Sequence, residues 1–353
     1  MMPPDTATPA RIAATHAGRL RAKRIWVAAL VAVTLAAFAA DVLLGPTALS
    51  AEGALRALFG LQTESRTDGF IVWNVRLPAA MTAFLVGACL ALAGAEMQTI
   101  LDNPLASPFT LGISSAASLG AALALILGLS VPGLPAAWIV PVNAFLFAAG
   151  AMALLYAVSS RPGRGPATLV LLGIAMVFAF NALVALVQYM ASQSALQQFV
   201  FWTMGSVSQT SWGRVGVLAL CLAVIFPLSF RARWQLTALR LGEDRARSFG
   251  IDTRRLRAMA LLRVTLLASL STAFVGTIGF VGLVGPHIAR LIVGEDHAYY
   301  LPASALVGAT VMLAAASVGE LLIPGIVLPT GIVTSLVGIP VFLVLVLRRR
   351  EGL

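Results

Sequence analysis

Hydrophobic residues along this chain fall into long stretches that short polar segments separate. A helix needs about 20 apolar residues to cross the hydrocarbon layer of a bilayer. Applied along the sequence, that length predicts ten membrane-spanning helices, with expected limits of 25–44, 77–100, 111–129, 138–158, 169–190, 212–230, 258–276, 278–293, 301–321 and 328–347. The seventh and eighth meet at "GTIGFVGLVGP", where the glycines predict a broken or re-entrant segment.

Composition supports this interpretation. Of the 353 residues, 59% are hydrophobic and only 11% are charged, too few to cover a soluble globule of this size. We therefore expect an all-α polytopic membrane protein. Its single transmembrane domain would span 25–347, between an N-terminal cytoplasmic tail, 1–24, and a basic cytoplasmic C-terminus, 348–353.

Small residues recur four positions apart inside two of the expected spans. Gly87 and Ala95 belong to one such stripe, and Gly112 and Gly120 to another. Small side chains let helix backbones approach closely in lipid, so the stripes predict tight helix packing.

Basic residues gather in alternate connections between the spans. If the amino end is cytoplasmic, 20 of the 24 lie inside, leaving Arg56, Arg66, Arg76 and Arg214 outside. The inside group comprises Arg11 to Arg24, Arg161, Arg164, Arg231 to Arg263, Arg290, and Arg348 to Arg350. By the positive-inside rule, both termini are cytoplasmic. Short basic clusters between apolar runs are typical of such loops, so we expect no nucleic-acid partner.

The chemistry of a self-energised pump is missing from the sequence. A P-loop needs a lysine after its glycine-rich turn, and the only lysine, Lys23, follows no such turn. Ion-driven carriers usually place carboxylates at the midplane, whereas Asp41, Glu96 and Glu320 fall near span ends. We expect Glu96 to be a water-facing carboxylate at the inner interface.

A metal centre is not indicated either. A zinc helix needs histidines four apart with a glutamate between them, but His287 and His297 are ten apart and His16 lies in the tail. We expect no metal, no cofactor and no catalytic residue. The charges from Arg290 to His297 are predicted to anchor the eighth span at the inner water interface.

Four segments carry a family resemblance. They are "RLPAAMTAFLVGACLALAGAEMQTILDNPLASPFTLG", "LTALRLGEDRARSFGI", "GFVGLVGPHIARLIVGEDHAYYLPASALVGA" and "LPTGIVTSLVGIPVFLVLVL". In order and spacing they resemble the signature segments of the FecCD permeases, the membrane subunits of bacterial importers for ferric siderophores, haem and cobalamin.

The resemblance implies a type II ABC importer permease with ten helices per subunit. Its implied partners are a second permease subunit, identical or different, two ATP-binding cassette ATPase subunits, and a periplasmic binding protein. The chain would be a transport subunit and not an enzyme. The expected cargo is a ferric siderophore, with haem or cobalamin as alternatives. A stand-alone ion-coupled secondary transporter is the competing class.

The basic segment 231–257 is the expected site of coupling to the ATPase. Glycines at 242 and 250 predict a short helix between them. The resemblance implies that this helix enters a cleft on the ATPase, and the matching positions are Leu241, Gly242, Glu243, Ala246, Phe249 and Gly250. The alternative is a basic loop that rests on acidic lipid headgroups.

At the outer face the chain departs from the family pattern. Arg76 is kept from "RLPR", but Ala79 replaces the second arginine, and Glu320 stands where "ADxxAR" has its arginine. Arg76 and Glu320 are nevertheless the expected contacts with the binding protein. The reversed charge predicts either a different partner permease or a binding protein with a basic residue there. Alternatively, Glu320 is simply an exposed helix end.

The family's fifth and tenth helices line the translocation pathway, which here means roughly 169–189 and 331–345. Their polar members are Asn181, Gln188, Thr334 and Ser335. A weakly polar lining suits a bulky chelate that must pass without sticking. Equally, the same side chains could form hydrogen bonds between helices.

Overall fold

The computed structural model describes the chain except for residues 1–8, 46–48, 63–64, 160–165, 324 and 349–353, and it leaves out the side chains of 9–16, 66, 159, 166 and 344–348. The predicted positions Arg161, Arg164, Arg349 and Arg350 therefore lie outside the described residues, as do the side chains of Arg11, Arg66 and Arg348.

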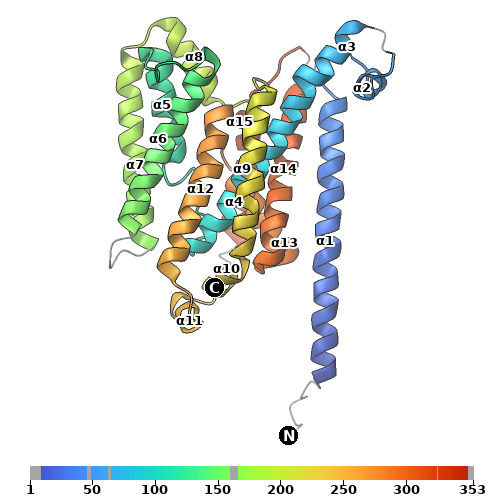
Figure 1. Ribbon diagram of the computed structural model, residues 1–353, viewed down its shortest axis with the longest axis vertical. Coiled ribbons are helices and arrows are strands. Elements are labelled where there is room, and N and C mark those ends of the chain that lie inside the picture. Colours follow the sequence, from blue (N-terminus) through green and yellow to red (C-terminus); the bar gives the residue numbers. More distant parts are fainter. Residues whose placement is uncertain (1–8, 46–48, 63–64, 160–165, 324, 349–353) are drawn as a thin grey trace.

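The described residues form an all-helical bundle (Figure 1). The long helices are α1 (Pro9–Leu43), α4 (Leu77–Ile100), α5 (Ile113–Leu127), α6 (Ala136–Ser159), α7 (Pro166–Tyr189), α9 (Trp212–Arg231), α12 (Thr253–Val275), α13 (Val281–Val293), α14 (His297–Leu321) and α15 (Thr330–Arg348). Short segments connect them: α2 (Ala51–Leu58), α3 (Arg66–Ile71), the π-helical η1 (Val72–Arg76), α8 (Gln193–Thr203), α10 (Arg233–Leu239) and α11 (Glu243–Ser248).

Each of the ten predicted spans overlaps one of these helices. In the described part of the chain, seven helices have the length and apolar composition to cross a membrane. The other three, α5, α13 and α15, are shorter apolar helices. At 13 residues, α13 is about 20 Å long, less than the hydrocarbon thickness.

The structure bears on two predicted boundaries, the start of the first span and the break between the seventh and eighth spans. From Pro9 onwards the predicted tail is helical and continuous with the first span, because α1 runs without interruption from Pro9 to Leu43. The predicted break in "GTIGFVGLVGP" is confirmed. Helix α12 ends at Gly276 with a φ of 77°, and α13 begins only after Phe280, whose φ of 66° is unusual for a residue with a β-carbon.

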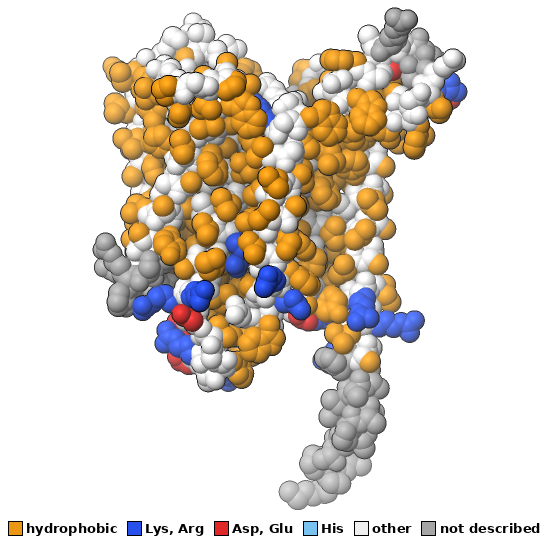
Figure 2. All heavy atoms as spheres, viewed as in Figure 1, with side chains coloured by type: hydrophobic (Ala, Val, Ile, Leu, Met, Phe, Trp, Pro, Cys, Tyr) orange, Lys and Arg blue, Asp and Glu red, His pale blue; other side chains and the backbone are white. Residues whose placement is uncertain are grey.

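The two ends of the bundle differ in charge. Helices α2, α3 and α8 lie at one end, and α10 and α11 at the other, which is also the end to which the N-terminus of α1 points (Figure 1). On the face shown in Figure 2, Lys and Arg side chains gather at the α10–α11 end, whereas the body of the bundle is covered by hydrophobic side chains. This distribution agrees with the prediction that the α10–α11 end is cytoplasmic.

Helix α4 is the centre of the packing. Most of its residues are buried, and it contacts α9, α12, α13 and α14. Its glycines permit this, because a β-carbon on Gly94 would overlap the Gly282 carbonyl of α13, and one on Gly87 would overlap the Gly308 carbonyl of α14. The predicted stripe through Gly87 therefore is a site of direct backbone contact.

A buried ion pair joins α4 to α12. Arg263 Nε lies 2.9 Å and 3.0 Å from the two carboxylate oxygens of Glu96, and Nη2 lies 2.6 Å from Oε2. Glu96 is 0% exposed and Arg263 is 5% exposed. The expectation of a water-facing Glu96 is wrong, because the paired guanidinium takes the place of water. Arg263 likewise lies in a helix within the bundle and not in the basic loop.

We predict that Glu96→Gln lowers the free energy of unfolding by about 3 to 5 kcal/mol, because it leaves the Arg263 charge buried without a counterion. Unfolding equilibria in bicelles measure this loss. The double change Glu96→Leu, Arg263→Met should recover most of it. The matched control is Glu52→Gln, which breaks an exposed pair of 2.7 Å with Arg56 and should cost less than about 1 kcal/mol. Equal losses at the two sites would contradict the prediction.

Gly94→Ala is expected to cost about 1 to 3 kcal/mol, because its methyl group must separate α4 from α13. The matched control is Gly216→Ala in α9, where an added β-carbon meets nothing within 4 Å. There the better helix propensity of alanine should stabilise by up to about 1 kcal/mol. Thermal unfolding in detergent compares the two variants, and a stable Gly94→Ala protein would show that α4 and α13 do not need to touch.

Candidate functional site: the α10–α11 element

Between the end of α9 at Arg231 and the start of α12 at Thr253, the chain folds as two short helices, α10 and α11. The predicted helix between two glycines is confirmed, since α11 runs from Glu243 to Ser248. Gly242 has a φ of 104° and Gly250 a φ of 78°, which side chains with a β-carbon adopt at a cost. The glycines therefore set where the helix starts and where the chain leaves it.

Glu243 fastens α11 to α12. Its Oε1 accepts hydrogen bonds from Arg247 Nη2 at 2.6 Å and from Thr253 Oγ1 at 3.1 Å. Its Oε2 accepts one from Arg257 Nη2 at 2.7 Å. The hydrogen bond from Arg257 lowers the pKa of Glu243 below its ordinary 4.5, against the opposing effect of partial burial. The carboxylate is thus turned back onto its own chain.

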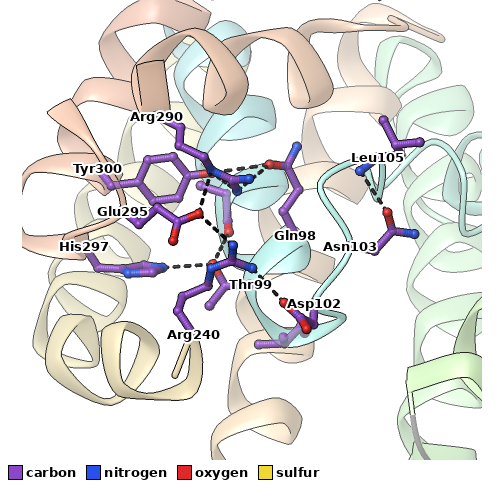
Figure 3. Close-up of polar contacts among 12 residues, drawn as sticks. Gln98, Thr99, Asp102, Asn103, Leu105, Arg240, Arg290, Glu295, His297 and Tyr300 are labelled. Carbon is purple, nitrogen blue, oxygen red and sulfur yellow. Dashed lines mark hydrogen bonds and ion pairs between the residues drawn. The ribbon is translucent and has the colours of Figure 1, made fainter. Parts of the chain in front are cut away.

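Two arginines then connect this element to the end of α4. Arg257 Nε donates to the Ile100 carbonyl at 3.2 Å. Arg240 reaches Asp102 at 2.8 Å through Nη1 and Glu295 at 2.6 Å through Nη2, as Figure 3 shows. We call Arg240 and Arg257 the anchor arginines. A displacement of α11 would be passed through them to the helix at the centre of the bundle.

A second group of polar side chains stands behind the Arg240 contacts (Figure 3). Arg290 donates to Gln98 Oε1 and to the Tyr300 hydroxyl, both at 3.2 Å. The His297 ring lies 2.8 Å from Thr99 Oγ1 and 3.1 Å from Thr237 Oγ1. His297 is 1% exposed, so its predicted place at the water interface is wrong. Two threonine hydroxyls satisfy its ring nitrogens in place of water.

Among the exposed charged residues of the element, three large apolar side chains are also exposed. Leu241 is 53% exposed, Phe249 is 55% exposed, and the ring of Trp234 contacts that of Phe249 with 6.1 Å between centroids. Ala246 is fully buried beneath them. Exposed apolar side chains at the charged end of a membrane protein form a surface suited to a protein partner. We call Trp234, Leu241 and Phe249 the apolar patch.

At the opposite end, Arg76 has a structural task. It is 5% exposed and donates to the carbonyls of Leu43 at 2.8 Å and Val42 at 3.3 Å, where α1 ends. Glu320 lies one turn after Ser317, whose hydroxyl donates to Asp41 at 2.7 Å. In this conformation Arg76 is buried, which does not favour its predicted role in docking. Docking of the binding protein through Arg76 and Glu320 therefore stays a prediction.

The four predicted pathway residues do not come together. Asn181 lines a cavity between α5 and α7, and Gln188 is half-buried nearer the end of α7. The hydroxyls of Thr334 and Ser335 both donate to the Gly331 carbonyl of their own helix. Thr334 is also only 3% exposed. A pathway role for these residues therefore stays a prediction, and the local hydrogen bonds account for the two hydroxyls of α15.

Sequence reasoning missed the residues that hold the element in place. Arg240 pairs with a residue 138 positions away, and Arg257 with one 157 positions away. Both arginines look the same as their neighbours in the basic segment, so the sequence carried no signal for their partners.

A family model and individual relatives match the chain. The model of the FecCD transport family covers residues 33–348. The hemin transport system permease protein HmuU of Yersinia pestis is 37% identical over 79% of this chain and 84% of its own length. The Fe(3+)-citrate import system permease protein YfmE of Bacillus subtilis is 36% identical over 86% of this chain and 88% of its own length.

A solved structure agrees with the fold. It is an inward-facing conformation of a transporter assigned to the metal-chelate ABC type, with a TM-score of 0.79 and 30% identity over 91% of this chain and 98% of that one. Other relatives at similar identity are named for vitamin B12 in Vibrio cholerae and for molybdate in Haemophilus influenzae. Likeness alone therefore does not select a single cargo among these.

We predict that Glu243→Gln loosens α11, because the neutral amide loses the charge-assisted bonds to Arg247 and Arg257. Amide hydrogen exchange in α11 should accelerate roughly fivefold, about 1 kcal/mol for a partly exposed pair. Asp244→Asn, at an exposed position next in sequence, is the matched control and should leave exchange unchanged. Unchanged protection in Glu243→Gln would show that Glu243 does not hold the helix.

The same assay has a pH dependence. Because the folded pKa of Glu243 is lowered, its stabilisation of α11 is complete above 4.5 and is lost as the pH falls through the lower folded value. Protection of α11 should therefore be constant from neutral pH down to about 4.5, and should decline as the pH falls from there through the lower folded value. Glu243→Gln should show no such decline.

Proposed function

The chain belongs to the FecCD transport family of ABC importer permeases, and from this premise we propose that it moves a ferric siderophore chelate into the cytoplasm on power from a separate ATPase. The membrane subunit would pair with a second permease, receive its cargo from a periplasmic binding protein and dock two ATPase subunits at the α10–α11 end. Both termini would be cytoplasmic and the protein would reside in the inner membrane.

The α10–α11 element is the observation that carries the proposal. The element has an exposed apolar patch that a partner can bind, and hydrogen bonds and ion pairs join it to the helix bundle. An element that transmits a movement of the ATPase to the permease needs both features. Leu241 and Phe249 would enter the ATPase cleft, with Ala246 packed beneath them and Gly242 and Gly250 setting the ends of the helix. Glu243 would act as a positioning residue, because its carboxylate faces Arg257 and not the partner.

For the cargo, two observations favour a metal chelate. Relatives of comparable identity are named for ferric citrate and for hemin, and the solved structure with the TM-score of 0.79 is assigned to the metal-chelate type. Haem import by the same machinery is the second candidate, favoured by the identity to the hemin permease. Cobalamin remains the third possibility within the family.

The decisive experiment reconstitutes the permease in proteoliposomes with and without its ATPase and binding protein. Uptake of ferric chelate should require all components and ATP. The variant Leu241→Ser, Phe249→Ser should lose most ATPase co-purification and lower ATP-driven uptake at least about tenfold, because apolar anchors dominate such interfaces. The matched control, Leu61→Ser, Phe70→Ser, changes residues of 60% and 65% exposure that belong to the opposite end and should retain the ATPase.

Two outcomes would overturn the proposal. Uphill accumulation by the permease alone, driven by an ion gradient, would make it a secondary transporter. Full ATPase binding by Leu241→Ser, Phe249→Ser would place the docking surface elsewhere.

A further inference from the structure

A pocket with mostly apolar walls and several hydroxyl groups lies between α5 and α7. Its volume is about 520 Å³, and it is open on one side. The hydrogen-bonding side chains that line it are Thr110, Ser114, Ser115 and Ser118 from α5 and the turn before it, Asn181 from α7, and Thr203 and Thr277 at its edge. Such a concentration of hydroxyls is unusual in a chain with 59% hydrophobic residues.

Four of these side chains have no partner within the described residues. Thr203 donates to the Val200 carbonyl and Thr277 to the Thr203 carbonyl, so their hydrogens are used. No hydrogen bond joins the side chains of Ser114, Ser115, Ser118 and Asn181 to any described residue. Ser114 is only 7% exposed, and it also borders a smaller neighbouring cavity. We call these four side chains the hydroxyl–amide set.

The pocket carries no charge. None of its eleven lining residues is acidic or basic, and the remaining walls include Phe109, Ile174 and Phe178. Phe178 is 72% exposed, so the pocket adjoins the open face of α7. Unpaired hydroxyl and amide groups are costly against lipid chains. This face therefore suits a pathway that the second permease subunit shields from lipid, and not a surface in contact with hydrocarbon.

We propose that the hydroxyl–amide set is a transit site for a neutral, oxygen-rich ferric chelate of the tris-hydroxamate class, an inference that rests on the proposed function. Three monoanionic hydroxamates cancel the charge of one ferric ion and present carbonyl oxygens on the surface of the complex. Serine hydroxyls and the asparagine amide donate to such oxygens without needing to compensate a charge.

Cargoes with a net charge or with carboxylates fit this pocket less well. Three dianionic catecholates leave a triply negative complex, and haem carries two carboxylates. Moving such a charge out of water requires a cation or a counter-charge, which the lining residues do not supply. Neutral hydrogen bonds are also weak enough to release a chelate that must move on, as a transit site requires.

Equilibrium dialysis on the permease–ATPase complex in nanodiscs, without the binding protein, tests the site with two probes, a ferric tris-hydroxamate and a ferric tris-catecholate. The wild type should bind the hydroxamate at least about tenfold more tightly. Removing the three serine hydroxyls together, with Ser114→Ala, Ser115→Ala and Ser118→Ala, should weaken hydroxamate binding by about tenfold or more, given a few-fold loss for each neutral hydrogen bond. Catecholate binding should not change.

Ser269→Ala is the matched control, because Ser269 is a buried serine in α12 that also lacks a partner but lies outside the pocket. It should bind both probes like the wild type. The single variants Ser115→Ala and Ser118→Ala each should show a smaller loss, and they decide the matter if the triple variant does not assemble.

The outcomes separate this proposal from the one on which it rests. If the complete transporter imports ferric chelates but the wild type binds both probes equally, or the serine variants bind like the wild type, the transit site is refuted and the importer function stands. If the complete transporter imports no ferric chelate, the proposed function itself fails.

Discussion

Direct backbone contact between α4 and its neighbours is the constraint on which the rest of the structure depends. In lipid there is no hydrophobic force to press helices together, so attraction comes from close packing. Gly87 and Gly94 allow α4 to touch the backbones of α14 and α13. Any larger residue would move both helices outward.

The central position of α4 explains where the polar contacts lie. Glu96 on α4 meets Arg263 of α12 within the bundle, and the carbonyl of Ile100, at the end of α4, accepts from Arg257. Asp102, two residues further, accepts from Arg240. The helix with the tightest backbone packing is therefore also the one that the α10–α11 element holds. A displacement of the apolar patch would be transmitted to the core of the bundle through a few charge-assisted hydrogen bonds. Such bonds are shorter and stronger than neutral ones.

Elsewhere, some polar side chains have hydrogen-bond partners within the protein, and others have none among the described residues. Arg76, His297 and Thr334 all bind backbone carbonyls or neighbouring hydroxyls, so each is part of the architecture. The hydroxyl–amide set between α5 and α7 has no such partners among the described residues. The side chains that folding leaves without hydrogen-bond partners are the ones available to the proposed transit site.

The sequence by itself determined the features that depend on neighbouring residues. The length of each apolar run located the ten long helices, Gly242 and Gly250 located α11, the glycines after Val275 located the break before α13, and four motifs identified the family. Only the tertiary structure decided which distant residues meet. Glu96 and Arg263 are 167 positions apart, and nothing in either local stretch distinguishes a buried ion pair from two interfacial charges. The burial of His297 and Arg76 and the gathering of serines opposite Asn181 have the same origin. Helix formation follows from local hydrogen bonding and apolar length, whereas the environment of a side chain is set by helices that arrive from elsewhere in the chain.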